Sequence, residues 1–146
     1  MKNSFPITKY DGVIEKFIGD AVIVLFFEKG GPDYLERSVN CSIAVMEELE
    51  NWNASRKKRG ELSLQNGIGI ACGEIDFAFV GGVIKRHLHC SGEAVTLSEV
   101  MEAETKQGMH SKIFLDPEIA SSLEGQFDFG DIEIEAGLIR KEVSFD

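Results

Sequence analysis

Two segments near the start of the chain have the polarity pattern of paired β-strands. Alternate residues of Val13–Ile18 share a face, which places Glu15 and Lys16 on opposite faces. The segment Ala21–Phe27 is apolar throughout, which predicts a strand that is buried on both faces. Gly19–Asp20, between the two segments, has the composition of a tight two-residue turn. We therefore expect a β-hairpin with the aspartate at its tip.

A long helix is predicted after this hairpin. Asp33 and Glu36 have the spacing of a capping box, and Gly60 is a suitable stop signal. Between these signals apolar residues recur at helical spacing, at Leu35, Val39, Ile43, Met46 and Leu49. The basic run at positions 56–59 suits the negative end of the helix dipole, and we prefer this interpretation to a binding patch.

More strands are expected in the middle of the chain. Leu64–Val80 contains two strand-like stretches, and Arg86–Ser91 a third. In the first of these stretches Gly67 and Gly69 share a small-residue face, which lets another backbone or a ligand come close.

The last third of the chain predicts further helices and strands. A helix is expected over Ala94–Lys106, a short strand over Lys112–Leu115, a short helix from Asp116 to near Gly125 and a terminal hairpin within Phe127–Phe145. In the first of these helices the residues expected to face inward are Leu97, Val100 and Met101. The element order predicts the α+β class, with helices on an antiparallel-rich sheet.

Composition and charge narrow the classes of partner. The 146 residues suit a single domain over positions 1–146, and the net charge is -10. Such a surface repels phosphate backbones and anionic lipids, so nucleic acid and membrane surfaces are disfavoured as partners. Cys41, Cys72 and Cys90 are scattered without a C-x-x-C spacing, which indicates reduced thiols and a cytoplasmic location. No apolar run has the length of a membrane span or forms a signal peptide.

Three ordered segments resemble one enzyme family. Gly12–Ala21 resembles the "G-x-x-x-K-x-x-G-D-A" segment of class III nucleotidyl cyclases. Gly67–Glu74 looks like the "G-I-G-I-x-x-G-E" segment of that family, and Ser91–Leu97 looks like its "G-D-A-V-N-L" segment. Over positions 11–125 the chain therefore resembles the class III adenylyl/guanylyl cyclase catalytic domain, and it is N-terminally incomplete relative to that family.

The resemblance implies a fold and a reaction. The implied fold is a ferredoxin-like cyclase-homology sandwich with helices on one face of the sheet and with the opening strand missing. The implied reaction is that of a phosphorus-oxygen lyase in intracellular signalling, which converts ATP to cyclic AMP and pyrophosphate. Two Mg²⁺ or Mn²⁺ ions assist the attack of the ribose 3′ oxygen on the α-phosphate. The family's sites form between two domains, which implies a homodimer or a heterodimer with another cyclase domain.

The resemblance also implies roles for individual residues. Asp20 corresponds to the family's second metal-binding aspartate. Lys16 corresponds to the lysine with which adenylyl cyclases read adenine, where guanylyl cyclases usually have glutamate, and so ATP is favoured over GTP. The partner position for reading the base corresponds to His89.

At other positions that the resemblance aligns, this chain lacks the functional group that the family uses. The ribose-orienting asparagine corresponds to Thr96, the transition-state arginine to Val100 and a phosphate-binding lysine to Ala136. The first metal-binding aspartate of the family lies upstream of Met1. Because each lost donor typically costs a hundredfold or more in rate, we expect impaired catalysis and assign no catalytic residue.

Two alternatives from other functional classes stay open. The chain could be a non-catalytic module that pairs with a competent cyclase domain, or a small-molecule sensor that uses the region near Lys16. In addition, His87 and His89 alternate on one strand and could hold a metal ion, or they could form a polar strand edge.

The missing opening strand predicts a gap in the sheet, since in the family this strand lies beside the equivalent of Ala21–Phe27. The gap has three possible explanations: a longer native protein, partial filling by Met1–Ile7, or filling by a second chain. We therefore predict that the isolated chain is not a simple monomer.

Overall fold

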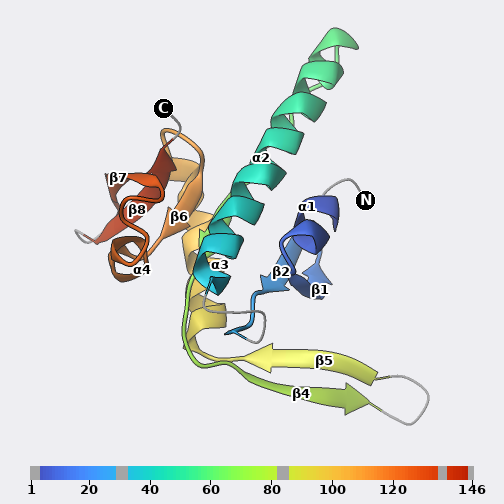
Figure 1. The fold of residues 1–146 in the computed structure, drawn as a ribbon. Helices are drawn as coiled ribbons and strands as arrows, with labels where there is room; N and C mark the ends of the chain where they lie inside the picture. The colour runs from blue at the N-terminus through green and yellow to red at the C-terminus, as the bar shows by residue number, and fades with distance from the viewer. Residues whose placement is uncertain (1–3, 29–32, 82–85, 135–137, 145–146) are drawn as a thin grey trace.

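The computed structural model describes residues 4–28, 33–81, 86–134 and 138–144 (Figure 1). The helices are α1 (Ser4–Lys9), α2 (Tyr34–Lys58), α3 (Glu93–Glu104) and α4 (Pro117–Ser121), with a 3₁₀ turn η2 (Thr105–Gln107) after α3. The strands are β1 (Val13–Ile18), β2 (Ala21–Leu25), β3 (Ile68–Ile70), β4 (Asp76–Gly81), β5 (Arg86–Ser91), β6 (Ile113–Leu115), β7 (Asp128–Glu133) and β8 (Ile139–Ser144). The α+β class, the first hairpin, the long helix and the terminal hairpin are confirmed.

The strands form three separate sheets in the described part of the chain. β3, β6, β8 and β7 form a four-stranded sheet in that order, in which β3 and β6 are parallel and the other pairs antiparallel. β1 and β2 form one antiparallel hairpin, and β4 and β5 form another. The β4–β5 hairpin extends away from the four-stranded sheet (Figure 1).

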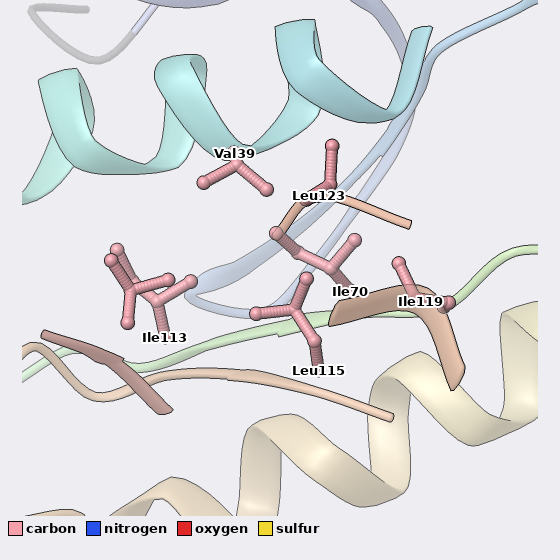
Figure 2. Packing of buried hydrophobic residues seen from close by; sticks show 7 residues of the cluster. Val39, Ile70, Ile113, Leu115, Ile119 and Leu123 are labelled. Atoms are coloured by element: carbon pink, nitrogen blue, oxygen red, sulfur yellow. The ribbon is translucent and has the colours of Figure 1, made fainter. Parts of the chain in front are cut away.

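The main core lies between α2 and the four-stranded sheet. Figure 2 shows Val39 of α2 above Ile70 of β3 and above Ile113 and Leu115 of β6. The predicted helical stripe is confirmed, because Leu35, Ile43 and Met46 pack against the same cluster. A second stripe on α2 was not predicted: it contains Cys41 and Val45 and packs against Ile7 of α1.

The glycines of β3 make room for a helix backbone. A Cβ atom at Gly69 would lie 2.3 Å from the carbonyl oxygen of Ser98 and 2.6 Å from the amide nitrogen of Glu102, both in α3. Of the two alternatives for this small-residue face, the structure therefore shows close backbone approach. Because Gly69 and Ile70 point to opposite faces of β3, α3 and α2 cover opposite faces of this strand. The arrangement differs in this detail from the expected layer of helices on one face.

The expected gap in the sheet corresponds to open edges of β2 and β3 among the described strands. Within the described residues β2 pairs only with β1, and β3 pairs only with β6. Ala21 and Val22 of β2 are exposed, so the prediction of a strand buried on both faces is wrong. Only the part of β2 next to the hairpin tip is exposed, because Val24 packs against the cluster of Ile7, Cys41 and Val45 and Leu25 is buried.

The start of the chain does not fill this gap as a strand. Ser4–Lys9 forms a helix, and Ile7 packs on α2. Filling by Met1–Ile7 is therefore wrong for its described part, while residues 1–3 lie outside the described residues. The prediction that the isolated chain associates stays a prediction.

One buried arginine ties the first hairpin to α2. The guanidinium of Arg37 donates to the carbonyl oxygens of Tyr10, Asp11 and Phe27, at 3.1, 3.5 and 2.8 Å. Its Nε also donates to Asp33 Oδ1 at 3.2 Å. Asp33 is the residue before the helix, but its side chain makes no capping hydrogen bond, so the capping-box prediction is wrong. Its carboxylate pairs with the arginine instead.

Candidate functional site

The first hairpin presents Asp20 to solvent at its tip. The two-residue turn is confirmed, with Phe17 paired to Val22 and Ile18 to Ala21. Gly19 has φ 59°, a left-handed conformation that glycine adopts at little cost. The aspartate is exposed.

The described residues do not fit the two-metal centre that the resemblance implies. No group of three or more His, Cys, Asp or Glu side chains among them is placed to hold a metal ion. A two-metal site of this kind is built on carboxylates that converge on the ions. Asp20 supplies one carboxylate, and the side chains of His87 and His89 lie outside the described residues.

A β-bulge changes the faces of Glu15 and Lys16. Ile14 pairs with Val24, and the next pairing along β1 is Lys16 with Ile23, so Glu15 is an extra residue in this strand. A bulge of this kind interrupts the alternation of side chains. The prediction that the glutamate and the lysine lie on opposite faces is therefore wrong.

Glu15 is buried and bonded to β5. Its side chain is 1% exposed, and its Oε1 accepts a hydrogen bond from the backbone N–H of Cys90 at 3.3 Å. Lys16 Nζ lies 3.9 Å from the same oxygen, and this lysine side chain is 39% exposed. Glu15 Oε2 is buried and has no hydrogen-bond partner among the described residues. We did not identify Glu15 from the sequence, although a charged residue within a strand pattern is a signal that could have found it.

The pKa of the Cys90 thiol is raised, by burial and in part by the nearby Glu15 carboxylate. Burial of the thiol and, second, the negative charge of Glu15 raise its pKa, while Lys16 acts in the opposite direction. His89 is the preceding residue of β5, where its backbone pairs with Ala78 of β4. The side chain of this histidine lies outside the described residues, so its role in reading a base stays a prediction.

Thr96 and Val100 lie one helical turn apart on α3. The hydroxyl of Thr96 donates to the carbonyl oxygen of Gly92 at 3.4 Å, in the first turn of the helix. Val100 is 46% exposed, so the prediction that it faces inward is wrong, whereas Met101 is fully buried as expected. The cause is the packing of α3 on β3, which turns Met101 toward the strand. Ala136 lies outside the described residues.

The structure brings some of the predicted residues together. Lys16 and the strand that contains His89 meet through Glu15, and α3 with Thr96 begins directly after β5. Asp20 stands apart at the hairpin tip. A depression of about 190 Å³ between α4 and β7 includes Phe127 and Lys141, and its lining residues do not belong to β1, β5 or α3.

Two further findings concern the cysteines and the possibility of a membrane-spanning helix. Cys41, Cys72 and Cys90 form no disulfide, as predicted from their spacing. No helix among the described residues is both long enough and apolar enough to cross a membrane.

Comparisons with known proteins agree on one family. The family model described as "Adenylate and Guanylate cyclase catalytic domain" matches residues 7–143. A search of curated proteins found no significant match.

Several solved structures share the fold. The guanylyl cyclase Cya2 is 24% identical with a TM-score of 0.76, and the alignment covers 97% of this chain and 74% of Cya2. The adenylyl cyclase CyaB from P. aeruginosa is 19% identical with a TM-score of 0.83, covering 99% of this chain and 78% of CyaB. The guanylate cyclase domain of RhGC from Catenaria anguillulae, solved in complex with GTP, is 16% identical with a TM-score of 0.72 and coverages of 99% and 79%. With the family model matching most of its length, the chain belongs to the adenylate and guanylate cyclase catalytic domain family.

Proposed function

We propose that this chain is a nucleotide-binding cyclase domain with impaired conversion of ATP to cyclic AMP and pyrophosphate. The observation that carries the proposal is the contrast between Lys16 and Val100. The lysine ammonium lies where two hairpins meet and is part-exposed, whereas the family's arginine position presents a valine that is 46% exposed. Lys16 can thus contact a nucleotide. Val100, however, has no charge with which to stabilise the negative charge that develops on the phosphates during the reaction.

Lys16 supports a preference for adenine. An ammonium donates hydrogen bonds and accepts none, and both purine bases present ring nitrogens that accept them, so the preference for adenine rests on the family resemblance. Family adenylyl cyclases use a lysine at this position, and we extend that role to Lys16. His89 is the proposed second reader, since it stands on the strand that Glu15 links to β1.

Asp20 is the proposed contact for a Mg²⁺ or Mn²⁺ ion that accompanies the nucleotide. Its exposure leaves the carboxylate accessible to such an ion. Because the described residues bring no further ligands to the tip, we expect the ion to be held weakly.

A second candidate function is a pairing module for a competent cyclase domain. It is favoured by apolar side chains on the first hairpin, where Val13, Phe17 and Val22 are 41%, 54% and 39% exposed. Exposed apolar residues gathered on one element mark interaction surfaces more often than single exposed ones do.

The test of the first proposal measures nucleotide binding and turnover separately. Displacement of a fluorescent nucleotide, in the presence of Mn²⁺, gives the affinity of the purified chain for ATP and for GTP. We expect Lys16→Ala to weaken ATP binding about tenfold, the effect of losing one charge-assisted hydrogen bond. Lys16→Glu is expected to reverse the preference toward GTP. Lys106→Ala, which removes an exposed lysine from the 3₁₀ turn η2, is the matched control and should change neither affinity.

Turnover decides between the candidates. We expect no cyclic nucleotide from the pure chain with ATP or GTP and Mn²⁺, and detectable product from it would contradict impaired catalysis. Product that appears only after a competent cyclase domain is added would favour the pairing module. Equal ATP affinity of the parent chain and Lys16→Ala would refute the proposed base contact.

A further inference from the structure

The two hairpins of this chain meet through a side chain rather than through a backbone ladder. β1 and β5 are in contact, yet they belong to different sheets among the described strands. The N–H of Cys90 points away from β4 to the outer edge of β5, where Glu15 Oε1 accepts it at 3.3 Å. The carboxylate therefore occupies the place that a carbonyl oxygen of a neighbouring strand takes in a continuous sheet.

The burial of this carboxylate limits where the Lys16 ammonium can stand. A buried carboxylate is costly unless cations or hydrogen-bond donors compensate its charge. Glu15 is 1% exposed with one oxygen unpartnered, and Lys16 Nζ, at 3.9 Å from the other, supplies the compensating positive charge. The bulge in β1 makes this pairing possible, because it interrupts the alternation that would separate the two side chains.

The Glu15–Cys90 contact has a candidate base reader beside it on each strand. Lys16 follows Glu15 in β1, and His89 precedes Cys90 in β5. A change in the separation of β1 and β5 at this point moves both positions relative to each other.

We propose that Glu15 is a positioning residue, which holds β1 against β5 and thereby sets the arrangement of Lys16 and His89 that selects the base. The proposal rests on the proposed function for its nucleotide, but its link between the strands is measured without any nucleotide. Glu15 does not touch the base in this scheme, because both of its oxygens are buried.

The first measurement follows the strand link in the absence of nucleotide. In Glu15→Ala we expect the Cys90 amide hydrogen to exchange with solvent about tenfold faster, as expected when a charge-assisted hydrogen bond is lost. Alkylation of the Cys90 thiol, followed by peptide mapping, should also accelerate. Exposed Cys72 and buried Cys41, whose pKa burial raises to about 11, serve as fast and slow internal references. In Glu15→Gln an amide oxygen can still accept from Cys90, so exchange should stay near that of the parent chain.

The second measurement follows base selection. Loss of the Glu15 charge frees the Lys16 ammonium, so both variants should lower the ratio of ATP to GTP affinity, by about tenfold in Glu15→Ala and by less in Glu15→Gln. Glu50→Gln, which removes an exposed carboxylate from α2, is the matched control and should leave the ratio unchanged. Thermal unfolding of each variant separates these effects from a loss of fold.

The outcomes distinguish this inference from the proposed function. Unchanged exchange and alkylation at Cys90 in folded Glu15→Ala overturn the strand link. A parent chain that prefers ATP, with an unchanged affinity ratio in both variants, overturns the role in base selection. A parent chain that binds neither nucleotide overturns the proposed function and the base-selection role together, while faster exchange at Cys90 would still support the strand link.

Discussion

Buried charged side chains in this protein satisfy backbone groups that secondary structure leaves unpaired. Glu142 is fully buried in β8, and its carboxylate accepts the backbone N–H groups of Met109, His110 and Lys112 at 3.1, 3.1 and 2.9 Å. Arg37 does the converse for the carbonyl oxygens around the first hairpin. Each side chain takes the role that a neighbouring strand has in a sheet, so its loss removes several part-buried hydrogen bonds at once.

At the residue scale, Arg37→Ala is expected to destabilise the chain by about 3 kcal/mol, because it removes the part-buried hydrogen bonds of one guanidinium to the carbonyl groups of Tyr10 and Phe27. Urea unfolding followed by circular dichroism measures the change. Arg37→Lys should recover only part of the loss, since an ammonium lacks the planar fork that reaches Tyr10 and Phe27 together.

The control for this prediction is Arg59→Ala. Arg59 pairs with Glu61 on the exposed side of the chain after α2, and its side chain is 53% exposed. We expect the unfolding midpoint to stay unchanged in this variant. A similarly small effect of Arg37→Ala would contradict the structural role of the buried guanidinium.

At the element scale, the position of α3 depends on glycines in and before β3. Gly67 and Gly69 both lack the Cβ atom that would collide with this part of the chain, the first against Thr105 and the second against the helix backbone. Close approach of α3 to β3 in turn sets which face of the helix is exposed, and hence the exposure of Thr96 and Val100.

Gly69→Ala is therefore expected to destabilise the chain by about 2 kcal/mol through overpacking against backbone atoms that side-chain rotation does not relieve. Gly130→Ala in β7 is the matched control, because nothing lies within 4 Å of the added Cβ atom there. Urea unfolding of both variants measures the difference. Equal stability of the two variants would show that α3 does not approach β3 as closely as described.

At the scale of the whole molecule, open strand edges and exposed apolar side chains both favour association. β2 and β3 each have one unpaired edge among the described strands, and Phe17 on β1, the partner of β2, is 54% exposed. Light scattering at micromolar concentration is expected to give a mass above that of one chain, rising with concentration.

A pair of substitutions tests the surface involved. Phe17→Ser should reduce association, whereas Leu62→Ser, at a residue that is 85% exposed beyond the end of α2, should not. A well-folded monomer across the whole concentration range would refute the prediction.

Much of the local structure could be predicted from the sequence. The bounds of β1 and β5, the turn at Gly19–Asp20 and the long helix α2 follow from patterns that repeat over a few residues. The same local motifs led to the cyclase family, and the family model over residues 7–143 confirmed it. These features depend on neighbours in the chain, whose spacing the sequence states directly.

The candidate site depended on contacts between distant parts of the chain. Glu15 and Cys90 are 75 positions apart, and the bulge that allows their contact leaves no local pattern in a strand that otherwise alternates. Val100 fits a helical stripe, yet it is exposed because Gly69 lets α3 settle with Met101 inward. The sequence by itself determined the elements and the family, because hydrophobic period and turn chemistry act locally. Only the tertiary structure decided which side chains meet, because burial and charge pairing depend on elements that the chain folds together from far apart.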